Sequence, residues 1–251
     1  MTDTIKQDDR RDIHNSEVPM LCRSCEARHM GICGALNPDQ LLTLSKNTTK
    51  HVISAEQQIA VEGDRPTAYS NILSGVIKVS KLLPDGRQQI VALQFAPDLV
   101  GRPYEYENKA SIEAATDVKL CSFPRKVLDE LVSKSPDLER RLHKQSLREL
   151  DDARDWLLAL GRKTATERVA SFIYFTAQHI DPEALETKKV IQFQLPLKRS
   201  DIADFLGLTL ETVSRQITKL RQAKVIDLID SRTCQIVNLP KLRALAEASG
   251  G

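Results

Sequence analysis

Residues 200–220, SDIADFLGLTLETVSRQITKL, carry the most specific structural pattern in the chain. A helix is predicted on each side of Gly207, because glycine permits a sharp turn. Ala203 is small where the two helices must approach each other, and Val213 is apolar where the second helix packs on the first. The other core positions of the pattern are Ile202, Leu206, Leu208 and Ile217. The stretch is predicted to be a helix-turn-helix, since a plain helical hairpin does not need small residues at these places.

The first turns of the second helix carry side chains suited to recognising DNA bases. Glu211, Ser214 and Arg215 lie at i, i+3 and i+4, on one exposed face. In the major groove an arginine can donate two hydrogen bonds to guanine, a glutamate can accept one from cytosine, and a serine suits several bases. The alternative is a solvated, salt-bridged helix end. The other predicted DNA-binding residues are Thr209, which should cap the helix, Thr212, Lys198, Arg199 and Lys219.

The rest of the C-terminal region fits a small DNA-binding domain. The T-x-x-E pattern that begins at Thr164 is a capping box, which predicts the start of a helix. Two predicted strands, 225–229 and 234–238, are separated by a short polar turn and would form a β-hairpin wing. Residues 162–251 are therefore predicted to be a winged helix-turn-helix domain.

The region from His51 to Phe123 is predicted to be an antiparallel β-roll. Short stretches rich in Val, Ile and Leu alternate with turn signals about every ten residues, which is typical of β-rolls and jelly rolls. The turn signals are Glu62-Gly63-Asp64, Ser74-Gly75, Pro84-Asp85-Gly86 and Ala96-Pro97-Asp98. We assign residues 21–135 to a sensor domain with this roll. Residues 1–20 have mixed charge and no apolar periodicity, so we expect a disordered tail.

A long helix is predicted over residues 136–161, between the break at Ser135-Pro136 and Gly161, which is expected to end it. One face follows alternating spacings of three and four, the a/d pattern of a coiled coil. We call this face the seam; its residues are His143, Ser146, Leu150, Ala153, Leu157 and Leu160. The seam predicts a dimerisation helix, and Leu150, Ala153, Leu157 and Leu160 are its predicted apolar interface. The alternative is that this stripe packs on the β-roll of its own chain.

The composition is that of a globular protein. With 251 residues, the chain should form about two domains at roughly 150 residues each. Hydrophobic residues make up 41% and charged residues 28%, which excludes a collagen-like or wholly disordered chain. The net charge of +2 is too small to indicate nucleic-acid binding by itself. No apolar run approaches a membrane span of about 18 residues and the N-terminus is too polar for a signal peptide, so we expect a cytoplasmic protein without a membrane partner.

Three of the five cysteines lie close together, at Cys22, Cys25 and Cys33. In a reducing compartment an odd number of clustered cysteines favours metal ligation or redox chemistry over disulfides. Three thiols are one short of the four that zinc or a [4Fe-4S] cluster usually requires. The candidates for the fourth ligand are Cys121, Cys234 and His29. Cys121 and Cys234 could instead be ordinary buried cysteines, and spacing alone does not separate iron-sulfur from zinc.

From Cys22 onward the chain resembles the oxygen-responsive FNR branch of the cAMP receptor protein superfamily, particularly its FixK/FnrN/FnrL-like members. The resemblance rests on DLVG at 98–101, TERVASFIY at 166–174 and LGLTLETVSR at 206–215, together with the roll and the long helix. It implies that an oxygen-labile [4Fe-4S] cluster is bound by Cys22, Cys25, Cys33 and Cys121, without His29 or Cys234. The gap of seven residues between Cys25 and Cys33 is similar to the FnrN/FnrL-like pattern and longer than in the best-known enterobacterial members.

The same resemblance implies the partners of the chain. Family members bind as homodimers to palindromic double-stranded DNA with TTGAT-like half-sites, and Glu211, Ser214 and Arg215 stand at the base-contacting positions. RNA polymerase is an expected partner. The loop Pro84–Gln88 resembles a segment that contacts polymerase, but Arg87 stands where an acidic residue is common, so the contact residues stay open. Cyclic nucleotide is not expected, because Gly101–Ala114 lacks the Gly-Glu phosphate cassette followed by Arg-Ser or Arg-Thr.

The predicted fold class is therefore α+β: an N-terminal antiparallel β-roll like that of cyclic-nucleotide-binding domains, a long dimerisation helix and a C-terminal winged helix-turn-helix. The predicted function is an oxygen-sensing regulator that dimerises under low oxygen and controls anaerobic or microaerobic genes. The alternative keeps this DNA-binding fold but replaces the cluster with a structural zinc or a thiol-based redox switch. An enzyme is not expected, because the sequence offers no Gly-rich phosphate loop and no nucleophile with its base.

Overall fold

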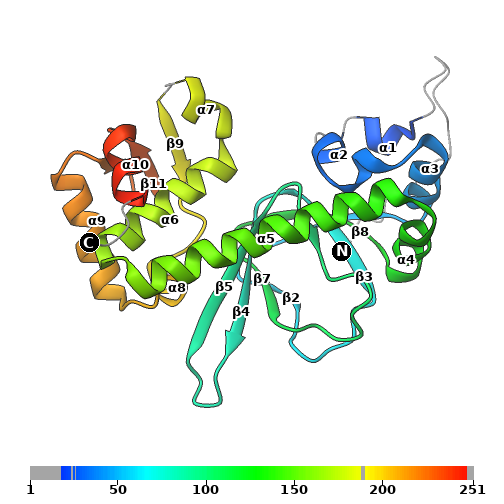
Figure 1. The fold of residues 1–251 in the computed structure, drawn as a ribbon, viewed down its shortest axis with the longest axis horizontal. Helices are drawn as coiled ribbons and strands as arrows, with labels where there is room; N and C mark the ends of the chain where they lie inside the picture. Colours follow the sequence, from blue (N-terminus) through cyan, green and yellow to red (C-terminus); the bar gives the residue numbers. More distant parts are fainter. Residues whose placement is uncertain (1–17, 24, 26, 188–189, 248–251) are drawn as a thin grey trace. The chain divides into compact units, whose positions relative to one another are not determined.

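The computed structural model describes residues 18–247, except residues 24, 26, 188 and 189. The tail predicted for residues 1–20 lies outside the described residues apart from 18–20. The chain divides into two compact units: the first contains the residues up to Val79 together with Leu93–Glu149, and the second contains Ser80–Ala92 together with the residues from Leu150 onward. The predicted order of an antiparallel roll, a long helix and a winged helix-turn-helix is confirmed (Figure 1).

The β-roll consists of two four-stranded sheets. The first has the order β1 (Thr49–Ile53), β8 (Val118–Pro124), β3 (Ala68–Ser74) and β6 (Leu99–Val100). The second has the order β2 (Gln58–Ala60), β7 (Ser111–Ala114), β4 (Val76–Leu82) and β5 (Gln88–Phe95). Apolar side chains from both sheets form a common buried cluster that includes Ile72, Ile77 and Leu120. Strand β8 lies between β1 and β3 and pairs antiparallel with both, so its residues are held from two sides.

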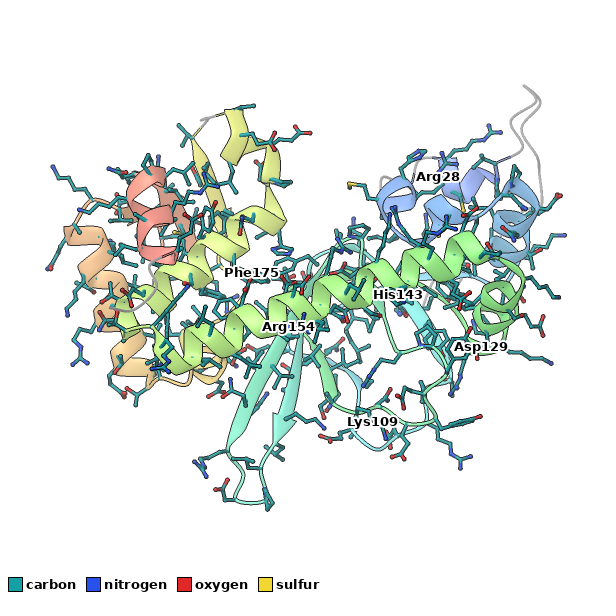
Figure 2. All side chains as sticks on the ribbon, viewed as in Figure 1. Arg28, Lys109, Asp129, His143, Arg154 and Phe175 are labelled. Atoms are coloured by element: carbon teal, nitrogen blue, oxygen red, sulfur yellow. The ribbon has the colours of Figure 1, made fainter. Side chains whose placement is uncertain are left out.

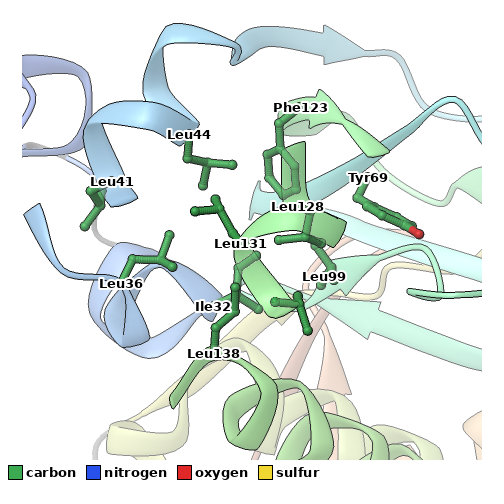
Figure 3. Packing of buried hydrophobic residues seen from close by; sticks show 11 residues of the cluster. Ile32, Leu36, Leu41, Leu44, Tyr69, Leu99, Phe123, Leu128, Leu131 and Leu138 are labelled. Carbon is green, nitrogen blue, oxygen red and sulfur yellow. The ribbon is translucent and has the colours of Figure 1, made fainter. Parts of the chain in front are cut away.

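Short helices precede the roll and contain two of the N-terminal cysteines, Cys22 and Cys33. They are α1 (Met20–Arg23), α2 (Ala27–Met30), the 3₁₀ helix η1 (Ile32–Ala35) and α3 (Pro38–Lys46), and α4 (Arg125–Lys134) packs with them. Ile32 is buried in a core formed with Leu41, Leu128 and Leu138 (Figure 3). Burying such a side chain contributes about 1.5–3 kcal/mol. Ile32 therefore anchors the cysteine segment at the position next to Cys33.

The long helix α5 spans Pro136–Arg162. Pro136 stands at its first residue, where the missing N–H of proline costs no hydrogen bond. The expected end at Gly161 is wrong by one residue. The amide of Lys163 donates to the carbonyl of Ala159 at 3.0 Å, so the last turn stays hydrogen-bonded past the glycine. None of the described helices is long and apolar enough to cross a membrane.

The second unit holds the remaining helices and a three-stranded sheet in the order β10-β11-β9. The elements are α6 (Ala165–Ile180), α7 (Pro182–Thr187), β9 (Ile191–Gln194), α8 (Arg199–Leu206), α9 (Leu210–Gln222), β10 (Ile226–Leu228), β11 (Thr233–Ile236) and α10 (Leu239–Glu247). The capping box is confirmed, because Thr164 and Glu167 satisfy each other's backbone amides at the start of α6. The two wing strands are also confirmed, although both are shorter than predicted.

Candidate metal centre and nucleic-acid interface

The three N-terminal cysteines and the distant Cys121 line one small cavity of the first unit. Antiparallel pairing places Cys121 of β8 directly opposite Lys50 of β1 and Asn71 of β3. Paired residues of neighbouring strands lie on the same face of a sheet. The N-terminal helix α2, on which Figure 2 labels Arg28, contacts β3. The cavity of about 20 Å³ is lined by Cys22, Cys25, Ala27, Arg28, Cys33, Lys50, Asn71, Leu73 and Cys121.

Burial in the cavity raises the pKa of the thiols of Cys22, Cys33 and Cys121. Burial raises the pKa of Cys33 to about 12, and the neighbouring thiols of Cys121, Cys22 and Cys25 raise it as well. Burial also raises the pKa of Cys121 to about 12, against the lowering effect of the Lys50 ammonium. The pKa of Cys22 is raised by burial and by Cys25. The thiols of Cys22 and Cys25 therefore lie close enough to raise the pKa of both Cys33 and Cys121.

Two polar side chains that line this cavity each have one buried atom without a hydrogen-bond partner in the described part of the chain. The Nδ2 atom of Asn71 donates to the sulfur of Cys33 at 3.4 Å. Its Oδ1 atom and the Nε atom of Arg28 are buried and have no hydrogen-bond partner among the described residues. Buried polar atoms without partners are uncommon and indicate that a further group belongs nearby. The sequence analysis did not identify Asn71, Arg28 or Lys50, because no local pattern distinguishes these polar residues from others.

The donor set fits a thiolate-bound metal group in its chemistry, because four cysteine sulfurs share one cavity. In their present positions, however, the described residues include no group of three or more His, Cys, Asp or Glu side chains that could hold a metal ion. Metal binding would therefore require the sulfurs to approach one another and to lose their protons.

The other two candidate ligands do not line this cavity. Cys234 is buried in β11 of the second unit, and burial raises its pKa to about 12. His29 is exposed, and its Nε2 atom lies 2.8 Å from Nη2 of Arg28, which donates to it. The structure thus brings Cys121 to the three N-terminal cysteines and does not bring Cys234 or His29.

The helix-turn-helix consists of α8 and α9. Gly207 caps α8 in the left-handed conformation, with φ 60° and ψ 43°, which glycine adopts without strain. Ala203 and Val213 are buried as expected. The predicted apolar residues Ile202, Leu206 and Ile217 are buried too, and Leu208 is half-buried. This core fixes the angle at which α9 leaves the turn.

The predicted base-contacting face is present at the start of α9. The hydroxyl of Thr209 accepts a hydrogen bond from the amide of Thr212 at 3.2 Å, so Thr209 caps the helix. Glu211 and Arg215 are exposed, and Ser214 is half-buried. Hydrogen bonds from its own amide and from the Thr209 hydroxyl lower the pKa of Glu211, so this side chain is an anionic acceptor at neutral pH.

The predicted phosphate contacts differ in their surroundings. Lys198 and Lys219 are exposed, near the beginning of α8 and toward the end of α9. Arg199 is half-buried, its Nη2 atom donates to the carbonyl of Ser231 in the wing at 3.4 Å, and burial lowers its pKa. Arg199 therefore also links α8 to the wing.

Comparisons with known proteins agree with this geometry. The Crp-like helix-turn-helix domain matches residues 167–245, and the cyclic nucleotide-binding domain matches residues 50–135. The chain is 47% identical to a protein of Rhizobium leguminosarum bv. viciae named "Probable transcriptional activator", over 95% of this chain and 98% of that protein. It is 36% identical to the transcriptional activator protein FnrL of Cereibacter sphaeroides, over 90% and 93% of the two chains.

The chain belongs to the CRP/FNR family of transcription regulators. Among solved structures, FixK2 from Bradyrhizobium japonicum is similar, with a TM-score of 0.73 and 30% identity, over 81% of this chain and 99% of that one.

In this CRP/FNR chain the apolar seam of α5 faces solvent. Leu150 is 44% exposed and Leu157 is 71% exposed, Ala153 is exposed, and Leu160 is half-buried. The opposite side of the same segment is buried through Trp156 and Ala159. The indole of Trp156 packs edge-to-face on Phe205 of α8, with 4.5 Å between ring centroids, and on Phe175 of α6, labelled in Figure 2. One stretch of helix therefore presents the seam and contacts the helix-turn-helix.

Arg168 is a further positioning residue that the sequence analysis missed. Its Nε atom donates to the carbonyl of Lys163, just after α5, at 3.0 Å. Its Nη1 atom donates to the carbonyl of Leu206, at the end of α8, at 3.1 Å. The hydroxyl of Thr166 also donates to Oε1 of the buried Gln216 in α9 at 2.7 Å. The start of α6 thus fixes both helices of the motif to the end of α5.

Proposed function

We propose that this regulator senses oxygen through a [4Fe-4S] cluster held by Cys22, Cys25, Cys33 and Cys121. The observation that carries the proposal is the single cavity lined by these four thiols, although Cys121 follows Cys33 only after most of the β-roll. Similarity to FnrL supports it. When bound, the cluster would supply an oxygen-labile centre.

The chain's own residues would support such a group in three ways. Ile32 fixes the backbone beside Cys33 by its burial in the core. The cations of Lys50 and Arg28 lower the pKa of Cys22, so they would partly offset the negative charge of the thiolates. The amide of Asn71 can keep its hydrogen bond to the sulfur of Cys33. Hydrogen bonds and charges of this kind determine the properties of iron-sulfur sites.

The test is the metal content of protein purified without oxygen. We expect about four iron and four acid-labile sulfide per chain. Air exposure should remove both. Zinc at about one per chain with no iron would contradict the cluster and favour the structural zinc site. Metal-free protein with reversibly oxidised thiols would also contradict it and favour a thiol switch.

The DNA-binding part of the proposal is a homodimer on a palindromic site. Two half-sites one helical turn apart are engaged together only by a dimer, so the monomer–dimer equilibrium controls DNA binding. The exposed seam is short, and burying one leucine contributes about 1.5–3 kcal/mol, so the association is marginal and easily shifted. The intact cluster would favour the dimer by ordering the N-terminal segment against the roll and α5.

Sedimentation of one preparation before and after air exposure tests this switch. We expect a dimer without oxygen, and a mainly monomeric form with weak DNA binding after exposure. An unchanged dimer that has lost DNA affinity would contradict the monomer–dimer mechanism and favour a reorientation of the DNA-binding domains.

The remaining parts of the proposal concern the partners. The regulator acts in the cytoplasm, binds TTGAT-like palindromes at anaerobic or microaerobic promoters, contacts RNA polymerase, and works neither as an enzyme nor through a cyclic nucleotide. DNA binding by the anaerobic protein, measured with and without cyclic AMP, tests the last point. Stimulation by the nucleotide would contradict it.

A further inference from the structure

A second and much larger cavity lies in the cysteine-bearing unit, beside the first half of α5. Its volume is about 460 Å³, within the range of sites that bind small molecules. One wall is the backbone of residues 29–32, between Cys25 and Cys33, and the other wall is α5. This cavity is separate from the one that the four cysteines line, and His29 belongs only to the larger one.

The wall formed by α5 is strongly cationic. Arg141, Lys144 and Arg148 follow each other at intervals of three and four residues, so their side chains project from one helix face. None of the described residues that line the cavity is acidic. Two carboxylates lie beside this wall: Asp98 accepts a hydrogen bond from Arg148 at 3.3 Å, and Glu149 accepts one from Nε2 of Gln145 at 2.7 Å. Lys144 is exposed and makes no hydrogen bond or ion pair within the described part of the chain.

The two walls are held together by specific contacts. Nη2 of Arg141 donates to the carbonyl of His29 at 2.9 Å and also to the carbonyl of Met30. The side-chain amide of Gln145 forms two hydrogen bonds with the backbone of Leu99. Its Oε1 atom accepts from the amide of Leu99 and its Nε2 atom donates to the carbonyl of Leu99, each at 3.1 Å. Gly31 allows the segment to approach the roll, because a Cβ atom there would lie only 3.0 Å from the carbonyl oxygen of Pro97. These contacts within the protein therefore form the cavity without a ligand.

The cavity also avoids the seam of α5. His143, the first seam residue, is two residues from Arg141 and therefore about 200° further around the helix. Figure 2 labels His143 on α5. The proposed dimer would bury the seam, and this cationic face of α5 would remain open to a small ligand.

We propose that this cavity binds a small, multiply charged anion through phosphate or carboxylate groups. Arginine recognises both groups with paired hydrogen bonds, and a lysine adds a point charge. Lys144 would pair with the negative charge of the ligand. Arg141 would add its own charge, because its present partners are uncharged carbonyls, whereas Arg148 shares its charge with Asp98. Because Arg141 holds the carbonyls of His29 and Met30, an occupied cavity also restrains the segment between Cys25 and Cys33.

Titration calorimetry on the full-length protein tests the site, with inorganic pyrophosphate and citrate as the two probes. Sodium chloride at matched ionic strength controls for screening. Lys144→Gln should weaken binding about tenfold or more, which corresponds to the loss of one charge-assisted contact. Lys126→Gln, a change of an exposed lysine on α4, should leave binding unchanged.

The two probes separate the sources of the ligand. Tighter binding of pyrophosphate supports a phosphate compound, and tighter binding of citrate supports a carboxylate; amide hydrogen exchange at residues 29–32 should slow in either case. Binding no stronger than that of the salt control, or binding insensitive to Lys144→Gln, would overturn the proposal. Neither outcome depends on a metal, so the site can fail while the cluster proposal stands.

Discussion

The cysteine cavity and the recognition helix are built in contrasting ways. The recognition helix is a continuous segment whose cap, turn and contact residues all lie within about twenty positions of each other. The cysteine cavity joins an N-terminal segment to a strand of the roll, and it becomes a site only through the pairing of β8 with β1 and β3.

The two regions also differ in how their surroundings shift the pKa of their ionisable side chains. Glu211 and Arg215 remain in solvent, and hydrogen bonds lower the pKa of Glu211, so this carboxylate of the predicted base-contacting face is ionised at neutral pH. Burial raises the pKa of Cys33 and Cys121 to about 12, so these thiols stay protonated at neutral pH, and binding of a metal would require them to lose their protons. The two regions therefore differ in how deeply their polar side chains are buried.

The largest effect is expected when the thiol of Cys121, which is distant in the sequence from the other three, is removed from the cysteine cavity. Cys121→Ala should abolish cluster assembly, because three thiolates leave one iron without its ligand. Iron and acid-labile sulfide after anaerobic purification measure the effect. Cys234→Ala is the control, since Cys234 is also a strand cysteine but lies in the other unit, and the cluster content of this variant should be normal. Normal iron content in Cys121→Ala would remove Cys121 from the ligand set.

The next largest effect is expected at the seam. Leu157→Glu should produce a monomer with or without oxygen. The dimer would lose two buried leucines, about 3 kcal/mol or more, which is over a hundredfold in affinity. Leu158→Glu is the matched control, because Leu158 is the adjacent residue, is 54% exposed and lies off the seam. Sedimentation velocity under nitrogen checks both variants; a dimeric Leu157→Glu protein would place the interface elsewhere.

A smaller and more selective effect is expected at the recognition helix. Arg215→Ala should cost about 1–3 kcal/mol on the cognate site and little on a site changed at the contacted guanine. Lys219→Ala should instead weaken all sequences similarly and reduce the salt dependence. Binding titrations at several salt concentrations distinguish the two. If Arg215→Ala still discriminates at the guanine, this side chain does not contact the base.

The smallest effect is expected at the helix cap. Thr209→Ala removes the hydroxyl that accepts from the amide of Thr212, and should lower the free energy of unfolding by about 1 kcal/mol. Thr209→Ser keeps the hydroxyl and should be close to wild type. Denaturant unfolding followed by the fluorescence of Trp156 reports on the second unit. Equal stability of the alanine and serine variants would show that the cap contributes nothing.

Some features followed from the sequence because they are local. The T-x-x-E box at Thr164, the turn at Gly207 and the cap at Thr209 depend on neighbours within a few residues, and each is present in the structure. The seam could be predicted from its spacing for the same reason. The end of α5 was misplaced by one residue, because the amide of Lys163 completes a last turn that glycine alone does not forbid.

Other features required the tertiary structure. Spacing left Cys121, Cys234 and His29 open as candidates for the fourth ligand, and only the packing of the N-terminal helices on the roll brings one of them, Cys121, to the N-terminal thiols. The sequence likewise did not predict the contacts that Asn71 and Arg168 make. A hydrogen bond across 38 residues, from Asn71 to Cys33 or from Arg168 to Leu206, has no periodic signature, because the partners meet only when separate elements pack together.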